Sequence, residues 1–122
     1  MEVILDTNFI ISCVKRKIDF IGRLREEGFN VLVPKEVINE MKDLEYDVAP
    51  AEKAAILLAL QILDTNKDIR KMKLGNKKVD ESLIEMGKKG AYIATLDRAI
   101  KHSVPNRVII SDSKNDILIE RA

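Results

Sequence analysis

The chain has 122 residues, of which 46% are hydrophobic and 34% are charged, a composition typical of a globular domain and not of a disordered chain. It contains one cysteine and one histidine, which excludes a disulfide framework and metal sites built from several Cys or His side chains. The formal net charge is +1, but residues 1–64 hold eight basic and twelve acidic side chains, whereas residues 65–110 hold eleven and five. We therefore expect one domain over residues 1–122. The charge split either places an acidic pocket beside a basic track or forms two ordinary solvated faces.

Short apolar runs rich in β-branched residues alternate with helical patterns along the chain. The predicted strands are residues 3–5, 31–33, 91–94 and 108–110, while residues 69–74 form either a further edge strand or a basic loop. The predicted helices are residues 9–14, 18–25, 35–44, 51–63, 79–89 and 98–102. Continuous apolar strands alternating with helices indicate an α/β fold, a three-layer α/β/α sandwich with a mainly parallel central sheet.

The predicted helix at residues 51–63 is apolar nearly all round. It is therefore either buried within one subunit or packed against a second copy, which leaves a homodimer open. No apolar run approaches the roughly 20 residues that a bilayer requires, and the N-terminus lacks the basic leader of a secretory signal. We expect a cytoplasmic protein with no membrane partner.

Acidic residues follow three of the predicted strands. Asp6, Asp97 and Asp112 each lie within three residues of the end of a strand. In open α/β sheets, ligands bind beyond the carboxyl ends of the strands, so the fold would bring these acids to one edge. Each acid taken alone is more simply explained as a helix N-cap, because Asp side chains accept hydrogen bonds from free backbone N–H groups.

Two further acids lie on predicted helices whose apolar neighbours face the core. Glu40 lies in the helix after Pro34, and Asp80 lies in the first turn of the helix at residues 79–89. Taken alone, Glu40 is explained by a surface position and Asp80 by an N-cap. An acid beside a buried helix face must nevertheless be paired, bound to a cation or placed at the mouth of a cleft.

Together, Asp6, Glu40, Asp80 and Asp97 would place up to four negative charges in one pocket. Such a cluster repels itself and raises carboxylate pKa values unless divalent cations neutralise it. Oxygen ligands select hard ions, so Mg²⁺ or Mn²⁺ is the expected cofactor and Zn²⁺ is not. Divalent ions in such sites commonly serve phosphoryl chemistry, which needs no histidine base.

The order of these motifs resembles that of the PIN-domain nucleases. The resemblance is carried by Asp6-Thr7-Asn8 after the first strand, Glu40 in residues 37–41, Asp80 in residues 79–83 and Thr95-Leu96-Asp97-Arg98 after a later strand. It covers nearly the whole chain, from residue 3 to about residue 111. Asp6-Thr7-Asn8-Phe9 and Asp97-Arg98 are most similar to the ribosomal-RNA-processing branch of the family.

The resemblance implies metal ligation by Asp6, Asp80 and Asp97. Glu40 would be a further ligand or would orient a metal-bound water. Because Glu81 follows Asp80, the ligand on that helix is one or the other of these two. The implied reaction is metal-assisted hydrolysis of an RNA phosphodiester, which leaves a 5′-phosphate and a 3′-hydroxyl.

The same resemblance assigns supporting roles to two polar residues. Asn8 would steady Asp6 by hydrogen bonding, and Thr95 would act in the same way near Asp97. Asp112 has no counterpart in the family pattern, so we interpret it as a cap or as an acid at the fringe of the site.

Basic residues crowd the segment before Asp80, and others follow Asp97. If they flank the acidic edge, they would hold the phosphates of an RNA strand on either side of the cut. A solvated basic face is the alternative interpretation. The expected RNA-binding residues are Lys71, Lys73, Lys77, Lys78, Arg98 and Lys101.

The leading hypothesis is a Mg²⁺- or Mn²⁺-dependent endoribonuclease that acts on structured or ribosomal RNA, with a ribosome-assembly protein as an expected partner. A toxin ribonuclease of a toxin–antitoxin pair, with an antitoxin partner, stays open, as does a catalytically silent module that binds RNA or protein. A phosphohydrolase with Asp6 as nucleophile is disfavoured, because such enzymes usually have a second acid two residues on, where this chain has Asn8.

Overall fold

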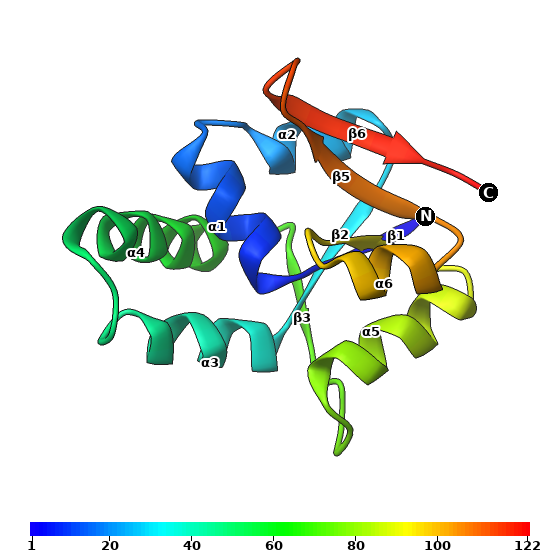
Figure 1. The fold of residues 1–122 in the computed structure, drawn as a ribbon, viewed down its shortest axis with the longest axis horizontal. Coiled ribbons are helices and arrows are strands. Elements are labelled where there is room, and N and C mark those ends of the chain that lie inside the picture. The colour runs from blue at the N-terminus through cyan, green and yellow to red at the C-terminus, as the bar shows by residue number, and fades with distance from the viewer.

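The computed structural model describes residues 1–122 and contains six strands and six helices (Figure 1). The strands are β1 (Glu2–Leu5), β2 (Asn30–Pro34), β3 (Arg70–Met72), β4 (Tyr92–Ala94), β5 (Arg107–Ser111) and β6 (Asp116–Glu120). The helices are α1 (Thr7–Lys15), α2 (Phe20–Glu26), α3 (Lys35–Leu44), α4 (Pro50–Thr65), α5 (Val79–Lys88) and α6 (Arg98–Ser103).

All six strands form one sheet in the order β3-β2-β1-β4-β5-β6. Strands β1 to β5 are parallel, and β6 pairs antiparallel with β5 at the edge. Ile4 in β1 aligns with Leu32 in β2 and with Ile93 in β4. The carboxyl ends of these three central strands therefore meet at one edge of the sheet. The predicted mainly parallel α/β fold is confirmed.

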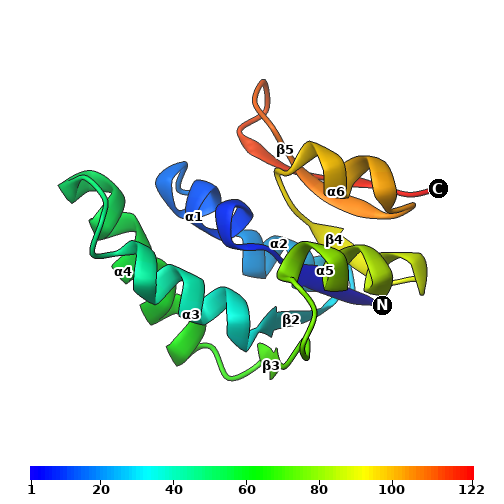
Figure 2. The ribbon, with the colours of Figure 1, turned by 60° about the horizontal axis from the view of Figure 1, so that its bottom comes forward.

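Side chains of the central strands alternate between two cores, one on each face of the sheet. Val3 and Leu5 of β1 belong to a large core with α1 to α4, whereas Ile4 belongs to a smaller core. Leu83 of α5 and Ile100 of α6 complete the smaller core. Figure 2 shows the resulting arrangement, in which α5 and α6 lie on the opposite side of the strands from α3 and α4. The cores account for the continuous apolar strands.

Three segments refine the sequence prediction. The segment at residues 69–74 contains the short edge strand β3, followed by a loop. Strand β6 was not predicted, although its Ile117-Leu118-Ile119 run follows a turn and is apolar. Helix α4 buries one face within the chain and leaves Leu57 and Leu58 about half exposed. None of the helices combines the length and the apolarity needed to cross a membrane.

Candidate active site

The predicted acids lie where the central strands end and helices begin. Asp6 links β1 to α1, and Asp97 is the N-cap of α6, which follows β4. Glu40 lies in the middle of α3, and Asp80 lies in the first turn of α5. Figure 1 shows α1, α3, α5 and α6 starting around one region, below the centre of the view. Residues far apart in the sequence thus reach one edge of the sheet.

The Asp6 side chain is held by two hydrogen bonds. One carboxylate oxygen, Oδ1, accepts the backbone N–H of Thr7 at 2.9 Å, and the other, Oδ2, accepts the Thr95 hydroxyl at 2.9 Å. The Asp6 backbone N–H donates to the carbonyl oxygen of Ala94, which ties the end of β1 to the end of β4. Asp6 is therefore a helix cap, and its carboxylate is also fixed from the neighbouring strand.

Thr95 links the two strand-end acids. It is fully buried, and its hydroxyl both donates to Asp6 and accepts the backbone N–H of Asp97 at 3.1 Å. The Asp97 carboxylate caps α6 by accepting the N–H of Ile100 at 3.1 Å through Oδ1. Its Oδ2 makes no hydrogen bond within the chain. Asp97 can therefore cap α6 and also contribute to the site, because capping uses one carboxylate oxygen and leaves the other available.

The pKa values of the Asp6 and Glu40 carboxyl groups are both raised above their ordinary values. Burial raises the pKa of Asp6, and the charges of Asp80 and Asp97 raise it further, against the hydrogen bonds from Thr95 and Thr7. Partial burial likewise raises the pKa of Glu40, and the charges of Asp6 and Asp80 add to that rise. Asp80 and Asp97 are therefore close enough to Asp6, and Asp6 and Asp80 close enough to Glu40, for their charges to be felt.

No basic side chain neutralises this cluster. Each ion pair in the structure involves other acids, and none includes Asp6, Glu40, Asp80 or Asp97. The donors are all carboxylate oxygens, a set that fits a hard divalent cation. As the side chains stand, no three of the chain's Asp, Glu, His or Cys side chains are close enough to share one ion. The chemistry of the donor set fits a metal, while the arrangement is more open than a closed coordination sphere.

Two buried hydroxyl groups beside the acids have no hydrogen-bond partner. They belong to Thr7, which follows Asp6, and to Ser82, which lies two residues after Asp80. The Thr7 hydroxyl lies near Glu40 and lowers the pKa of that carboxyl, although it makes no hydrogen bond of good geometry. Unpaired buried polar groups are rare in folded proteins. Sequence reasoning did not single out either residue, because a lone Thr or Ser near a helix start is a common feature.

The supporting role expected of Asn8 is not seen in the structure. Asn8 is exposed on α1 and makes no hydrogen bond to Asp6. It lines a separate hollow of about 360 Å³ with Ser12, Lys15 and Glu52. The Thr95 hydroxyl makes the hydrogen bond to Asp6 that was assigned to Asn8.

Asp112 follows β5 but does not join the site. Its carboxylate pairs with the Arg16 guanidinium at 2.5 Å, and its side chain is 85% exposed. The interpretation of Asp112 as an outlying acid of the site therefore finds no support, and its contact is a surface ion pair.

The expected RNA-binding residues differ in their contacts. Lys77 forms an ion pair with Glu85 of α5. Lys71 lines a hollow between α3 and α4, beside Lys42. The others lie in the loop between β3 and α5 (Lys73, Lys78) or on α6 (Arg98, Lys101), and none of these four side chains forms an ion pair.

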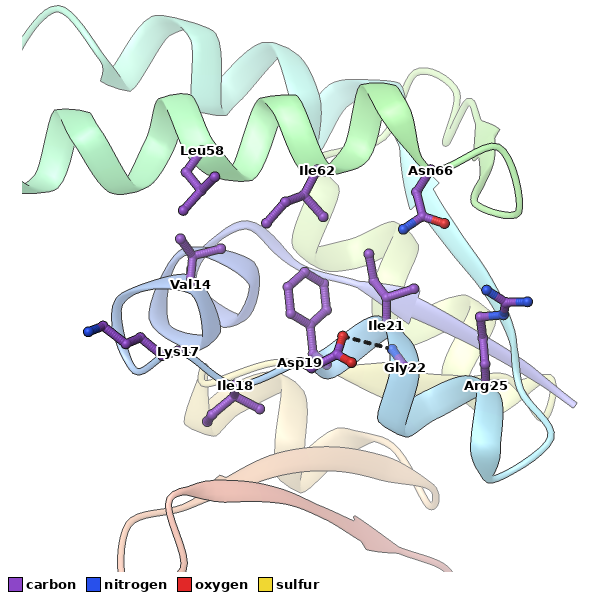
Figure 3. Close-up of a pocket in the computed structure, with 11 residues that line it drawn as sticks. Val14, Lys17, Ile18, Asp19, Ile21, Gly22, Arg25, Leu58, Ile62 and Asn66 are labelled. Carbon is purple, nitrogen blue, oxygen red and sulfur yellow. Dashed lines mark hydrogen bonds between the residues drawn. The ribbon is translucent and has the colours of Figure 1, made fainter.

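The largest hollow in the protein lies away from the acids. Its volume is about 550 Å³, and it separates α4 from the α1–α2 connection. Figure 3 shows Leu58 and Ile62 of α4 facing Val14 and Ile21, with the Asp19 carboxylate capping α2 through the N–H of Gly22. It shares no residue with the acidic edge, so it is a separate, mainly apolar feature.

Comparisons with known proteins agree with this architecture. The family model described as "PIN like domain" matches residues 3–111. Ribonuclease VapC9 of Archaeoglobus fulgidus is 32% identical over 108 residues, which are 87% of this chain and 77% of the relative. The solved structure of the PIN domain endonuclease Utp24 superimposes with a TM-score of 0.72 at 21% identity, covering 99% of this chain and 95% of that one.

The sheet order and the strand-end acids define the chain as an α/β protein with an acidic site at the carboxyl edge of a parallel sheet. The family match over residues 3–111 and the VapC9 relative then identify it further: the chain belongs to the PIN-like domain family. The resemblance to the PIN-domain nucleases is confirmed. The roles of individual site residues stay predictions.

Proposed function

We propose that the chain is an endoribonuclease that hydrolyses RNA phosphodiester bonds at the acidic edge formed by Asp6, Glu40, Asp80 and Asp97, with Mg²⁺ or Mn²⁺ as cofactor. The observation that carries the proposal is that strand ends and helices bring these four acids to one edge of the sheet, where none of them has a cationic partner in the chain. A ribonuclease among the relatives supports the reaction class. When bound, a divalent ion would activate water and offset charge on the scissile phosphate.

The chain's own residues have distinct tasks in this proposal. Asp6 and Asp97 present carboxylate oxygens from two adjacent strand ends, and Thr95 fixes their spacing. Asp80 and Glu40 supply the further negative charge from two helices that pack on opposite faces of the sheet. Asp80 rather than Glu81 is assigned here, because the charge of Asp80 acts on both Asp6 and Glu40.

The test is cleavage of a labelled structured RNA in Mg²⁺ and in Mn²⁺, with EDTA as the metal-free condition. We expect cleavage by the wild type with either ion and none in EDTA. An RNA that is bound but never cut, with either ion, would favour a catalytically silent binding module and overturn the proposal.

A toxin ribonuclease of a toxin–antitoxin pair is a second candidate role for the same chemistry. The VapC9 relative, which is covered over 77% of its length, favours it over a general processing role, whereas the likeness to Utp24 concerns the fold alone. The two roles differ in what unregulated expression does. Growth arrest that depends on Asp6 indicates a toxin, and normal growth with RNA cleavage in vitro indicates a processing enzyme.

A further inference from the structure

The loop between β3 and α5, residues 73–78, projects beside the acidic edge. In Figure 1 it forms the lowest part of the view, below the start of α5 and to the right of α3. It has no regular structure and turns at Gly75, whose φ of +98° lies in the left-handed region that favours glycine. The loop contains three exposed lysines, Lys73, Lys77 and Lys78. It is therefore a basic segment next to an acidic site.

One acid from another element fastens this loop. Both carboxylate oxygens of Glu36 accept the backbone N–H of Leu74, at 3.2 and 3.0 Å. Glu36 lies in the first turn of α3, four residues before Glu40, so both side chains lie on one face of that helix. The helix that bears one of the site acids thus also holds the first half of the loop.

The second half of the loop is fastened to α5. Lys77 forms an ion pair with Glu85, which leaves Lys73 and Lys78 as the lysines of the loop without an acidic partner. A loop held at both ends keeps these two ammonium groups near one place before any ligand arrives. Such ordering lowers the entropic cost of binding.

We propose that residues 73–78 form a preset arm that binds backbone phosphates of the RNA substrate through Lys73 and Lys78, and that Glu36 is the positioning residue that holds it beside the acids. This inference rests on the proposed function for the identity of the ligand. An acid beside a basic arm repels RNA, so the presence of Glu36 on α3 has to be explained. The paired hydrogen bonds to Leu74 provide that explanation, since a carboxylate can accept one backbone N–H through either oxygen.

A simpler role for Glu36 is available from its place in the helix. An acid in the first turn interacts favourably with the positive end of the helix dipole. That role depends on the charge and not on Leu74. The two roles can be separated, because Glu36→Gln removes the charge but keeps a side-chain oxygen that can accept the Leu74 N–H, whereas Glu36→Ala removes both.

The experiment measures binding of a short labelled RNA to proteins that carry Asp6→Asn, so that the RNA is not cut. Glu36→Ala, Glu36→Gln and the double variant Lys73→Ala/Lys78→Ala are compared over a series of salt concentrations. Lys53→Ala is the matched control, because Lys53 is exposed on α4 and has no ion pair. Amide exchange at Leu74 reports the anchor directly.

We expect the double lysine variant to bind about tenfold more weakly and to lower the slope of log affinity against log salt by roughly one to two, as loss of phosphate contacts requires. Glu36→Ala should bind several-fold more weakly and expose the Leu74 amide to exchange. Glu36→Gln and Lys53→Ala should bind as tightly as the parent, or in the case of Gln more tightly.

Equal affinities for Glu36→Ala and Glu36→Gln would overturn the anchoring role, and wild-type affinity in the double lysine variant would overturn the arm. Both outcomes are measured as RNA-binding affinities and do not depend on RNA cleavage. If the arm binds as expected but the protein with Asp6 intact does not cut RNA, the proposed function fails while the RNA-binding arm stands.

Discussion

Acidic side chains at two places in this sheet differ in whether a basic side chain pairs with them. On the β5–β6 hairpin, each acidic side chain is paired with an arginine, which comes from the end of α1, from α2 or from β5 itself. The pairs are Arg16–Asp112 at 2.5 Å, Arg23–Asp116 at 3.3 Å and Arg107–Glu120 at 2.6 Å. At the carboxyl ends of β1 and β4, by contrast, Asp6 and Asp97 are held by hydrogen bonds from a hydroxyl and from backbone N–H groups, and no cation pairs with them.

The difference does not reflect a shortage of basic residues near the site. Lys73, Lys78 and Arg98 lie on the loops and helix starts of the same edge, without ion pairs. The hairpin acids are neutralised within the chain, two of them by Arg16 and Arg23 at α1 and α2 and the third by Arg107 of β5. Nearby acids raise the pKa values of Asp6 and Glu40, and the proposed function assigns the neutralisation of the edge acids to a cation from outside the chain.

The most direct test of this comparison makes the same Asp-to-Asn substitution after two different strands. Asp6→Asn should lower the rate of RNA cleavage by at least about 100-fold, since even groups that only support metal ligands typically contribute 10–100-fold. Asp112→Asn, which removes an acid after β5, should leave the rate within about twofold, because surface ion pairs contribute little. Single-turnover cleavage of the same labelled RNA measures both variants. Equal losses would mean that the two acids do not differ in role.

Thr95 offers the next largest effect, because its hydroxyl serves both strand-end acids. Thr95→Val should slow cleavage by about 10–100-fold and destabilise the fold by about 1–3 kcal/mol, since it leaves a buried carboxylate oxygen and the Asp97 N–H without partners. Thr95→Ser keeps the hydroxyl and should stay close to wild type. Rates and denaturant unfolding are measured on the same preparations. A wild-type rate in Thr95→Val would show that Asp6 needs no positioning.

On the hairpin side, Glu120→Gln should cost less than about 1 kcal/mol of unfolding free energy and leave cleavage unchanged. The pair with Arg107 is partly exposed, and Gln can still accept a hydrogen bond from the guanidinium. Denaturant unfolding at low and high salt checks this prediction. A large loss of activity would place the hairpin in the site, against the contrast drawn above.

The smallest expected effect is a pH dependence at Glu40. Because its pKa is raised in the folded protein, the folded state binds more protons than the unfolded chain between the ordinary and the raised pKa. The contribution of Glu40 to the stability of the metal-free protein should therefore be greatest at low pH and fall as pH rises through the raised pKa. Glu40→Gln should remove part of that fall and add a few tenths of a kcal/mol at neutral pH. The prediction is contradicted if, in EDTA, the unfolding free energies of the wild type and of Glu40→Gln depend on pH in the same way.

Much of the fold was predictable because its strongest signals are local. The apolar runs ending at Leu5, Val33 and Ala94 and the proline before α3 gave the central strands and the helix starts. Strand β6 was missed because an antiparallel edge strand carries a weaker pattern, with Leu118 on its exposed face. Its place depends on antiparallel pairing with β5 and on the ion pair of Asp116 with Arg23, which lies 93 positions earlier in the sequence.

The acids of the site were predictable from strand ends, but their support was not. The family resemblance assigned Asn8 as the partner of Asp6, yet Asn8 is exposed on α1 and lines a separate hollow. Thr95 reaches Asp6 across 89 positions of sequence because β1 and β4 are neighbours in the sheet. The role of Glu36 depends likewise on where the β3–α5 loop passes α3, which no local pattern gives.

The central claim is that the acids at the carboxyl edge of the sheet bind a cation from outside the chain. It is tested most directly by thermal unfolding with and without Mn²⁺ after treatment with EDTA. The wild type and Asp112→Asn should be stabilised by Mn²⁺, by about 2.7 kcal/mol when the ion is at 100 times its Kd. Asp97→Asn, which loses the carboxylate with a free oxygen, should lose most of that stabilisation. The same stabilisation in all three proteins, or none in any of them, would contradict the claim.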